Sequence, residues 1–288
     1  MNNERTGMLI LCATPIGNLE DMTLRALRVL KEADLIACED TRTSAHLLAH
    51  YGIGTPLTSY HKFNEETKSE ELIGKMLLGS TVALITDAGM PAISDPGQIL
   101  VRKCHEAGVP VTAVPGACAA VTALALAGED TRRFVFEGFL PQDNKEKKAA
   151  LQRLEDESRT IVLYEAPHRL KRTLEALSDA LGEKRPVVLV REITKKYEEI
   201  QRTTLGEACG SAAEPRGEYV LVIAGRSAEE IRQRQAEQWE NMSISEHVAL
   251  YERQGMDRKS AMKAAANDRG ITKREVYQEL LESYSKNE

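Results

Sequence analysis

Short apolar runs alternate with longer amphipathic segments along the first 128 residues. The runs have the length of strands, and helical spacing follows them, as with Leu24, Leu27 and Leu30 after the first run. Alternation of this kind predicts a largely parallel sheet with helices on both faces. The expected strands are 8–12, 34–38, 57–60, 82–86 and 111–114.

A second set of strand-length runs begins after a break near Gly128. We therefore expect two α/β domains, an N-terminal one at 1–128 and a C-terminal one at 129–226. The composition turns polar and charged from Arg226 onward, which predicts a linker at 227–242. The strands expected in the second domain are 134–137, 160–164, 186–190, 200–203 and 219–224.

The last segment, 243–288, has apolar positions at helical spacing and no strand pattern. Gly255 and Gly270 fall at the breaks, and Asp257 and Thr272 are expected N-caps of the helices that follow. This pattern predicts a small module of three helices, similar to a helix-turn-helix fold.

Composition excludes several classes of protein. A chain of 288 residues with 42% apolar content can bury a sizeable core. No apolar run approaches the roughly 20 residues of a membrane helix, so we expect a cytoplasmic protein without a membrane segment. The five cysteines are scattered without a C-x-x-C pair, so neither a disulfide framework nor a metal site is expected.

Three loops that follow expected strands are candidates for a binding site: 13–23 (ATPIGNLEDMT), 86–97 (TDAGMPAISDPG) and 114–128 (VPGACAAVTALALAG). In open α/β sheets, ligands bind beyond the carboxyl ends of the strands. The first loop matches neither the dinucleotide nor the P-loop pattern, so a different ligand is expected. In the second loop, Ser94 or Asp95 before Pro96 predicts a helix N-cap. The small residues of the third segment allow close approach of a ligand or a partner domain.

Eight ordered motifs resemble the tetrapyrrole methylase superfamily and, within it, the small-subunit ribosomal RNA methyltransferase I family. The resemblance covers nearly the whole chain. It implies two α/β domains with S-adenosylmethionine held in a cleft between them, methylation of a cytidine ribose 2′-oxygen near the decoding centre, and a homodimer. The motifs that show the resemblance are ATPIGNLEDMTLRA, CEDTR, SYHKFNE, TDAGMPAISDPG, VPGACAAVTAL, LYEAPHR, VREITKKYEE and PRGEYVLVIAG.

The resemblance also implies a set of cofactor-binding residues. If Gly89 and Ala117 contact the cofactor, bulky replacements at either position should abolish cofactor binding. Met90 replaces the acidic residue of the superfamily's second loop, and nearby Asp87 is expected to recover that function, which argues against a porphyrin-like substrate. The implied cofactor contacts are Pro15, Asp87, Gly89, Pro91, Ile93, Ala117, Cys118, Tyr164 and Glu165.

Methyl transfer from a sulfonium depends chiefly on orientation and needs no metal, although a base that accepts the ribose hydroxyl proton adds rate. We take His61, Glu165 and Lys195 as the catalytic candidates. His168, which follows Pro167 at an expected helix start, is more simply explained by hydrogen bonding within the turn. Glu65 and Glu218 lie in the same motifs as these groups. The sequence itself does not select among the six as the proton acceptor.

The partner expected from the resemblance is the small ribosomal subunit or its 16S rRNA. The whole chain has a net charge of −6, but Tyr251 to Tyr277 contains seven Lys or Arg against four Asp or Glu. This local excess suits RNA backbone contact, and packing or dimerisation is the alternative. The proposed RNA contacts are Arg258, Lys259, Lys263, Lys273 and Arg274.

The sequence leaves two other functions open. One is a methyltransferase of the same fold that acts on a small molecule or a protein side chain. The other is a non-catalytic protein that senses the cofactor and binds nucleic acid.

Overall fold

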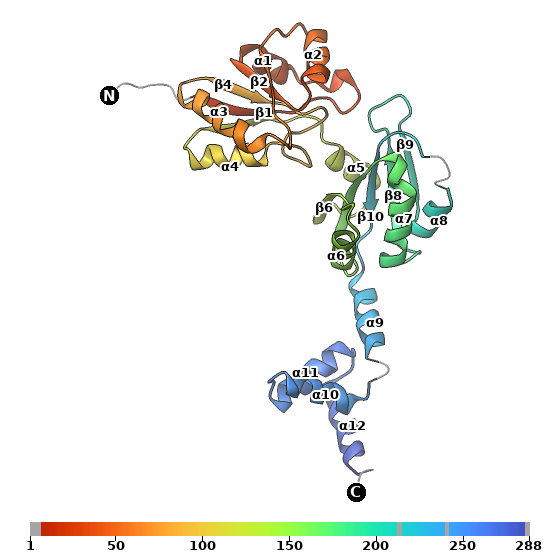
Figure 1. Ribbon diagram of the computed structural model, residues 1–288. Coiled ribbons are helices and arrows are strands. Elements are labelled where there is room, and N and C mark those ends of the chain that lie inside the picture. Colours follow the sequence, from red (N-terminus) through yellow and green to blue (C-terminus); the bar gives the residue numbers. More distant parts are fainter. Residues whose placement is uncertain (1–6, 212–214, 240–241, 286–288) are drawn as a thin grey trace. The chain divides into compact units, whose positions relative to one another are not determined.

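A computed structural model describes residues 7–211, 215–239 and 242–285 (Figure 1). The chain divides into two compact units. The first consists of 1–152 and 160–224, and the second of 153–159 and 225–288.

The first unit begins with a five-stranded sheet in the order β3-β2-β4-β1-β5, and every neighbouring pair is parallel. The predicted positions and the parallel arrangement of these strands are confirmed. The strands are β1 (Met8–Cys12), β2 (Leu35–Cys38), β3 (Leu57–Ser59), β4 (Thr81–Leu84) and β5 (Val111–Val114).

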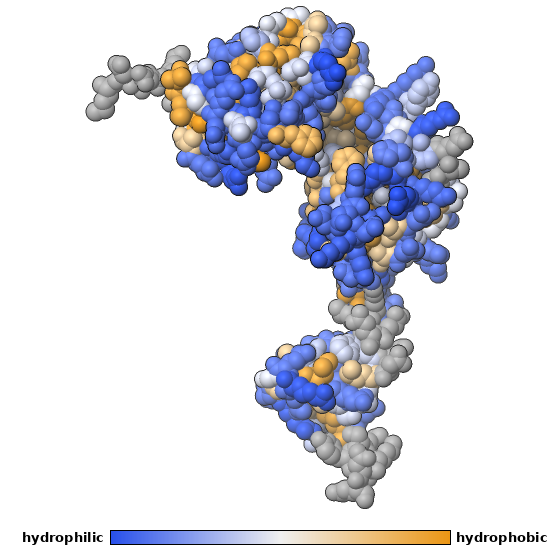
Figure 2. All heavy atoms as spheres, in the orientation of Figure 1, coloured by the Kyte–Doolittle hydropathy of each residue, from blue (hydrophilic) through white to orange (hydrophobic). Residues whose placement is uncertain are grey.

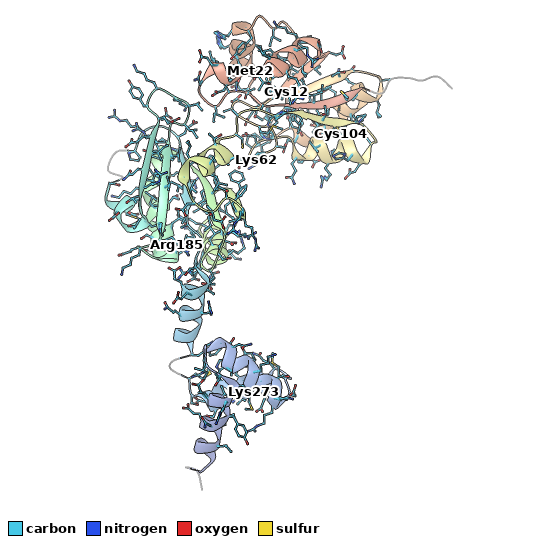
Figure 3. The ribbon with its side chains drawn as sticks, turned by 180° about the vertical axis from the view of Figure 1, so that it is seen from behind. Cys12, Met22, Lys62, Cys104, Arg185 and Lys273 are labelled. Atoms are coloured by element: carbon cyan, nitrogen blue, oxygen red, sulfur yellow. The ribbon has the colours of Figure 1, made fainter. Side chains whose placement is uncertain are left out.

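Helices cover both faces of this sheet. They are α1 (Leu24–Glu32), α2 (Thr41–His50), α3 (Glu65–Leu77) and α4 (Gln98–Glu106). Side chains alternate between the faces of a strand, so Ile10 packs with α1 and α2 while Leu9 packs with α3 and α4. Figure 3 labels Cys12 and Met22 in the first apolar cluster and Cys104 in the second.

A second sheet has the order β6-β7-β10-β8-β9. β6 and β7 are parallel, and the other neighbours are antiparallel. All five strands lie where the apolar runs predict them: β6 (Phe134–Phe139), β7 (Thr160–Glu165), β8 (Pro186–Arg191), β9 (Glu199–Thr204) and β10 (Tyr219–Ile223). The helices that accompany this sheet are α6 (Asn144–Leu154), α7 (Pro167–Leu181) and α8 (Leu205–Ser211).

Helix α5 (Ala119–Ala127) follows the first sheet in sequence but packs on the second. Its buried face is rich in alanine, and Ala120, Ala123 and Ala127 lie in one cluster with strand residues such as Val162 and Val222. Small side chains let the helix approach the sheet closely. The small residues of this segment thus permit close packing on the second sheet.

The second unit contains α9 (Ala228–Gln238), α10 (Ile244–Arg253), α11 (Arg258–Asp268) and α12 (Lys273–Ser285). The predicted N-caps are confirmed: Asp257 accepts from the amides of Lys259 and Ser260, and Thr272 Oγ1 accepts from the amide of Glu275. The last three helices share one apolar cluster.

Part of the segment expected as a linker is helical, because α9 lies within 227–242. The sequence of α9 is polar on all sides and lacks the apolar stripe that marks an amphipathic helix. Within the described residues, no helix has the length and apolar character needed to cross a membrane. Hydrophilic residues predominate on the visible face over α6 and α7 (Figure 2).

Candidate cofactor-binding and catalytic site

The three candidate loops follow β1, β4 and β5, which are adjacent strands in the order β4-β1-β5. Their carboxyl ends therefore meet at one edge of the sheet. Thr14 and Gly89 join the first two loops through paired backbone hydrogen bonds of 2.9 and 3.1 Å. The third loop lies against the first, because a Cβ at Gly116 would be 2.8 Å from Ala13 Cβ.

Gly89 is placed where a side chain is disfavoured by both conformation and space. Its φ is +81°, and a Cβ would lie 3.2 Å from Ile16 Cγ2 and 3.6 Å from the Ala117 carbonyl oxygen. A left-handed conformation is costly for residues other than glycine. Gly89 thus allows the three loops to converge.

The second loop does not cap α4 as the sequence suggested. The helix begins at Gln98 after Gly97, which has a φ of 140° and donates its amide to Glu65 Oε1 at 3.0 Å. Ser94 itself has a φ of 62°, outside the extended conformation typical of an N-cap. Asp95 is therefore not used as a cap, and its side chain is part of a cavity instead.

Three contacts join these loops to the second sheet. A Cβ at Gly138, in a bulge of β6, would lie 2.6 Å from Ser94 Oγ. A Cβ at Gly17 would lie 2.4 Å from Cγ of Lys195. Tyr164 Oη accepts a hydrogen bond of 3.0 Å from the amide at the start of α5.

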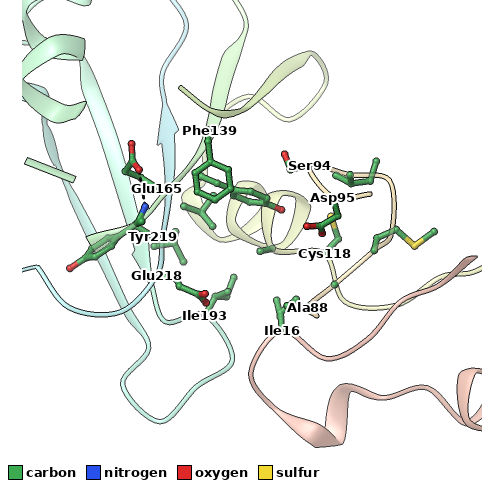
Figure 4. Close-up of a pocket in the computed structure, with 18 of the residues that line it drawn as sticks. Ile16, Ala88, Ser94, Asp95, Cys118, Phe139, Glu165, Ile193, Glu218 and Tyr219 are labelled. Atoms are coloured by element: carbon green, nitrogen blue, oxygen red, sulfur yellow. Dashed lines mark hydrogen bonds between the residues drawn. The ribbon is translucent and has the colours of Figure 1, made fainter. Parts of the chain in front are cut away.

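A cavity of about 250 Å³ lies between the loops and the second sheet (Figure 4). Its wall combines small residues, aliphatic and aromatic side chains, and a few charged groups. The charged lining residues are Asp95, Glu165, Lys195 and Glu218. The uncharged ones are Ile16, Ala88, Gly89, Met90, Ile93, Ser94, Cys118, Ala119, Phe139, Tyr164, Ala166, Val190, Ile193, Tyr219 and Val220.

The cavity brings together part of the residue set expected from the resemblance. Residues in its lining are Gly89, Ile93, Cys118, Tyr164, Glu165 and Lys195. Directly beside lining residues in the chain are Pro15, Asp87, Pro91 and Ala117. His61 follows β3 in the loop at 60–64 and is absent from the lining.

Glu165 is buried and its carboxylate is bound on both oxygens. Oε1 accepts from the amide of Ala166 at 2.8 Å and lies 3.4 Å from Arg169 Nε, while Oε2 accepts from Thr173 Oγ1 at 2.6 Å. These contacts fix the connection between β7 and α7. A carboxylate held in this way suits positioning better than proton transfer.

Lys195 forms ion pairs with Glu192 at 2.9 Å and with Glu218 at 2.8 Å. Partial burial by itself lowers the pKa of Lys195, but the hydrogen bonds to the two carboxylates outweigh it and the net shift is upward. An ammonium group of raised pKa is a poor base. The contacts suit a cation that links the second sheet to the first loop at Gly17.

Tyr164 is held between two aromatic neighbours, with ring centroids 5.0 Å from Phe136 and 5.7 Å from Phe139. Burial raises the pKa of Tyr164 to about 12. The phenol therefore stays protonated and serves as a rigid wall of the cavity.

Asp95 is the carboxyl group of the cavity whose environment most favours the neutral form. Burial first, and then the charges of Glu39 and Asp87, raise the pKa of Asp95 to about 7. Burial and Asp87 also raise the pKa of Glu39, which His61 opposes. His61 Nδ1 itself is buried without a hydrogen-bond partner among the described residues.

The sequence marks Asp95 as a candidate helix N-cap before Pro96 and does not mark it as a residue of the site. The apolar wall from the second sheet was missed as well, since Val190, Ile193 and Val220 read as ordinary strand residues. One signal could have indicated Asp95 as a site residue: it is an acidic residue in a loop that follows a parallel strand, β4. Within the described chain, no group of His, Cys, Asp and Glu side chains is arranged to hold a metal ion.

The residues proposed for RNA contact lie in the second unit. Arg258, Lys259 and Lys263 are exposed on α11, and Arg274 is exposed on α12. Lys273, the first residue of α12, is partly exposed.

Sequence relatives share most of the chain. Proteins named ribosomal RNA small subunit methyltransferase I are 48% identical over 273 residues in Halalkalibacterium halodurans and 47% identical over 273 residues in Bacillus subtilis. Each alignment covers 94% of this chain and 93% of the relative.

Solved structures share the fold at low identity. A uroporphyrin-III C-methyltransferase from Thermus thermophilus, complexed with S-adenosylhomocysteine, has a TM-score of 0.55 at 20% identity and covers 76% of this chain and 97% of its own. A cobalt precorrin-4 methyltransferase has a TM-score of 0.55 at 23% identity, covering 75% and 94%. Residues 8–209 match the family Tetrapyrrole (Corrin/Porphyrin) Methylases, and this chain belongs to that family.

Proposed function

We propose that this protein is an S-adenosylmethionine-dependent methyltransferase that acts on the RNA of the small ribosomal subunit, with a cytidine ribose 2′-hydroxyl as the acceptor. The cavity formed by three loops and the second sheet carries the proposal for the cofactor. Membership of the methylase family and relatives of 48% identity over 94% of the chain support the reaction and the substrate.

The residues of the cavity fit S-adenosylmethionine. Ala88, Gly89 and Ala119 leave space for a ligand beside loop backbone, and a side chain at Gly89 would crowd that space. Val190 and Val220 supply apolar surface suited to an aromatic base. Bound there, the cofactor would supply the methyl group from its positively charged sulfur. The sulfur then leaves as a neutral thioether.

Asp95 is suited to accept the proton of the ribose hydroxyl. It lies in the cavity wall, and a pKa near the working pH balances the ionised fraction against basicity. Among the three candidates from the sequence, Glu165 and Lys195 are bound to partners that suit positioning, and His61 is outside the cavity lining. We assign proton transfer to Asp95 and the shaping of the cavity to Glu165 and Lys195.

The proposal extends to the oligomeric state, the location in the cell and the RNA contacts of the protein. We propose a cytoplasmic homodimer, as the family resemblance implies, which light scattering on the purified protein tests. We also propose that the exposed basic residues of α11 and α12 contact rRNA. Their local positive charge suits phosphate groups.

A substrate comparison tests the function. Labelled S-adenosylmethionine is supplied with small ribosomal subunits that lack the modification, purified 16S rRNA, or uroporphyrinogen III. Transfer to the subunit or its rRNA supports the proposal. Transfer to the tetrapyrrole alone would make the protein a small-molecule methyltransferase, and cofactor binding without any transfer would favour a sensor protein.

A further inference from the structure

A second cavity, of about 290 Å³, lies where α6 and α7 begin. Its lining differs in character from that of the first cavity, because it is polar and strongly basic. The residues that matter are Gln142, Asn144, Lys147, His168, Arg169 and Arg172. Among the residues that the structure describes, no acidic side chain contributes to its lining.

The positive charge of this cavity is poorly neutralised. Arg169 donates to the Leu140 carbonyl oxygen at 2.7 Å and lies 3.4 Å from the carboxylate of Glu165. Within the described part of the chain, the side chains of Lys147 and Arg172 form neither an ion pair nor a hydrogen bond, and Lys147 is partly buried. Cations held together without carboxylate partners repel one another, so an anion is favoured among them.

Among the described residues, the nearby acids form no ion pair with Lys147 or Arg172. Asp143, just before α6, uses its carboxylate to accept from the amides of Lys145 and Glu146. Glu165 is buried and already bonded to Thr173 and Arg169. The positive end of the α7 dipole adds to the field, because the first turn of that helix contains no acidic residue.

The basic cavity adjoins the first cavity. Phe139 and Ala166 line the first cavity, and Pro141 and His168 line the second. Two residues of chain span at most about 7 Å, so the two linings are close. The ion pair between Glu165, in the first lining, and Arg169, in the second, connects them directly.

We propose that the basic cavity binds a phosphodiester group of the RNA substrate, next to the nucleotide whose ribose is methylated. This inference rests on the proposed function. A planar guanidinium such as that of Arg172 can bind phosphate oxygens in pairs, and Lys147 adds a point charge. Held there, the RNA backbone orients the ribose hydroxyl toward the first cavity, and orientation is the main requirement of this reaction.

The test compares two double variants with the same change of charge. K147Q/R172Q removes two cations from the basic cavity, and K148Q/K171Q removes their sequence neighbours, which do not line it. For the first variant we expect KM for the small subunit to rise at least tenfold and the slope of log affinity against log salt to fall by about one or more. The dissociation constant of S-adenosylmethionine and the unfolding temperature should change little.

The possible outcomes separate this inference from the proposed function. If the unaltered protein transfers no methyl group to the subunit or its rRNA, the proposed function fails, and direct RNA binding by fluorescence anisotropy then tests the cavity alone. Equal KM values and salt slopes for the two double variants would overturn the inference. So would binding of inorganic phosphate that depends on Lys147 and Arg172 while RNA binding does not.

Discussion

Replacing Asp95 with Asn removes the proposed proton acceptor with little change of shape. A group with a pKa of about 7 is about one tenth ionised at pH 6 and about nine tenths ionised at pH 8. The unaltered enzyme should therefore become on the order of tenfold faster between these pH values. D95N should lose this dependence and retain about 1/100 to 1/10,000 of the rate at pH 8.

The assay is the initial rate of label transfer to small ribosomal subunits, with both substrates well below KM so that the profile describes the free enzyme. D179N, which alters an exposed acid of α7, is the matched control and should keep the profile of the unaltered protein. D87N should move the midpoint to lower pH, because the charge of Asp87 helps to raise the pKa of Asp95. A D95N profile that rises like that of D179N would refute the assignment.

The same shift affects stability with a defined sign. The pKa of Asp95 is raised in the folded protein from its ordinary value of 3.8 to about 7, so the folded state holds a proton that the unfolded state releases. Stability should fall as pH rises through that interval. Thermal unfolding of D95N should be less sensitive to pH between 5 and 7 than unfolding of the unaltered protein.

Three further changes probe the loops, the cavity wall and the helical module. Gly89→Val should raise the dissociation constant of S-adenosylmethionine at least tenfold by calorimetry, whereas Gly108→Val, with a similar φ of +70° but open space around it, should affect stability alone. Tyr164→Phe leaves the amide at the start of α5 without its acceptor and should cost about 1 to 3 kcal/mol of stability in denaturant unfolding; an unchanged midpoint would contradict the role of that hydrogen bond. K259E/K263E should raise KM for the subunit with unchanged cofactor affinity, and no change in KM would favour packing or dimerisation for this surface.

The first sheet could be predicted from the sequence because its strands are short apolar runs separated by helical spacing. Parallel strands that share an edge bring their following loops together, so the convergence of the loops at Thr14, Gly89 and Gly116 followed from the pattern. The resemblance to known methylases implies the cofactor contacts in those loops, which stay a prediction.

Much of the site depends on packing that sequence spacing does not encode. Val190 and Val220 become part of the cavity only because α5 and three interdomain contacts place the second sheet beside the loops. The position of Asp95 depends on positive φ values at Ala92 and Ser94, which are unusual for these residues. Helix α4 therefore begins after Gly97, and neither Ser94 nor Asp95 caps it. The sequence gives no sign of that conformation.

The basic cavity illustrates the same difficulty for charge. Lys147 and Arg172 lie far apart in sequence, and the net charge of −6 conceals their proximity. His168, a predicted turn residue after Pro167, also lines the basic cavity. The tertiary arrangement of two helix starts is what makes these cations a common surface.

The position of the transferred methyl group separates the proposed reaction from its alternatives. Small ribosomal subunits lacking the modification are incubated with the protein and labelled S-adenosylmethionine, and nuclease fragments of the rRNA are analysed by mass spectrometry. We predict one labelled cytidine with the methyl group on its ribose 2′-oxygen. Label on a base, on a ribosomal protein, or on no component of the subunit would contradict it.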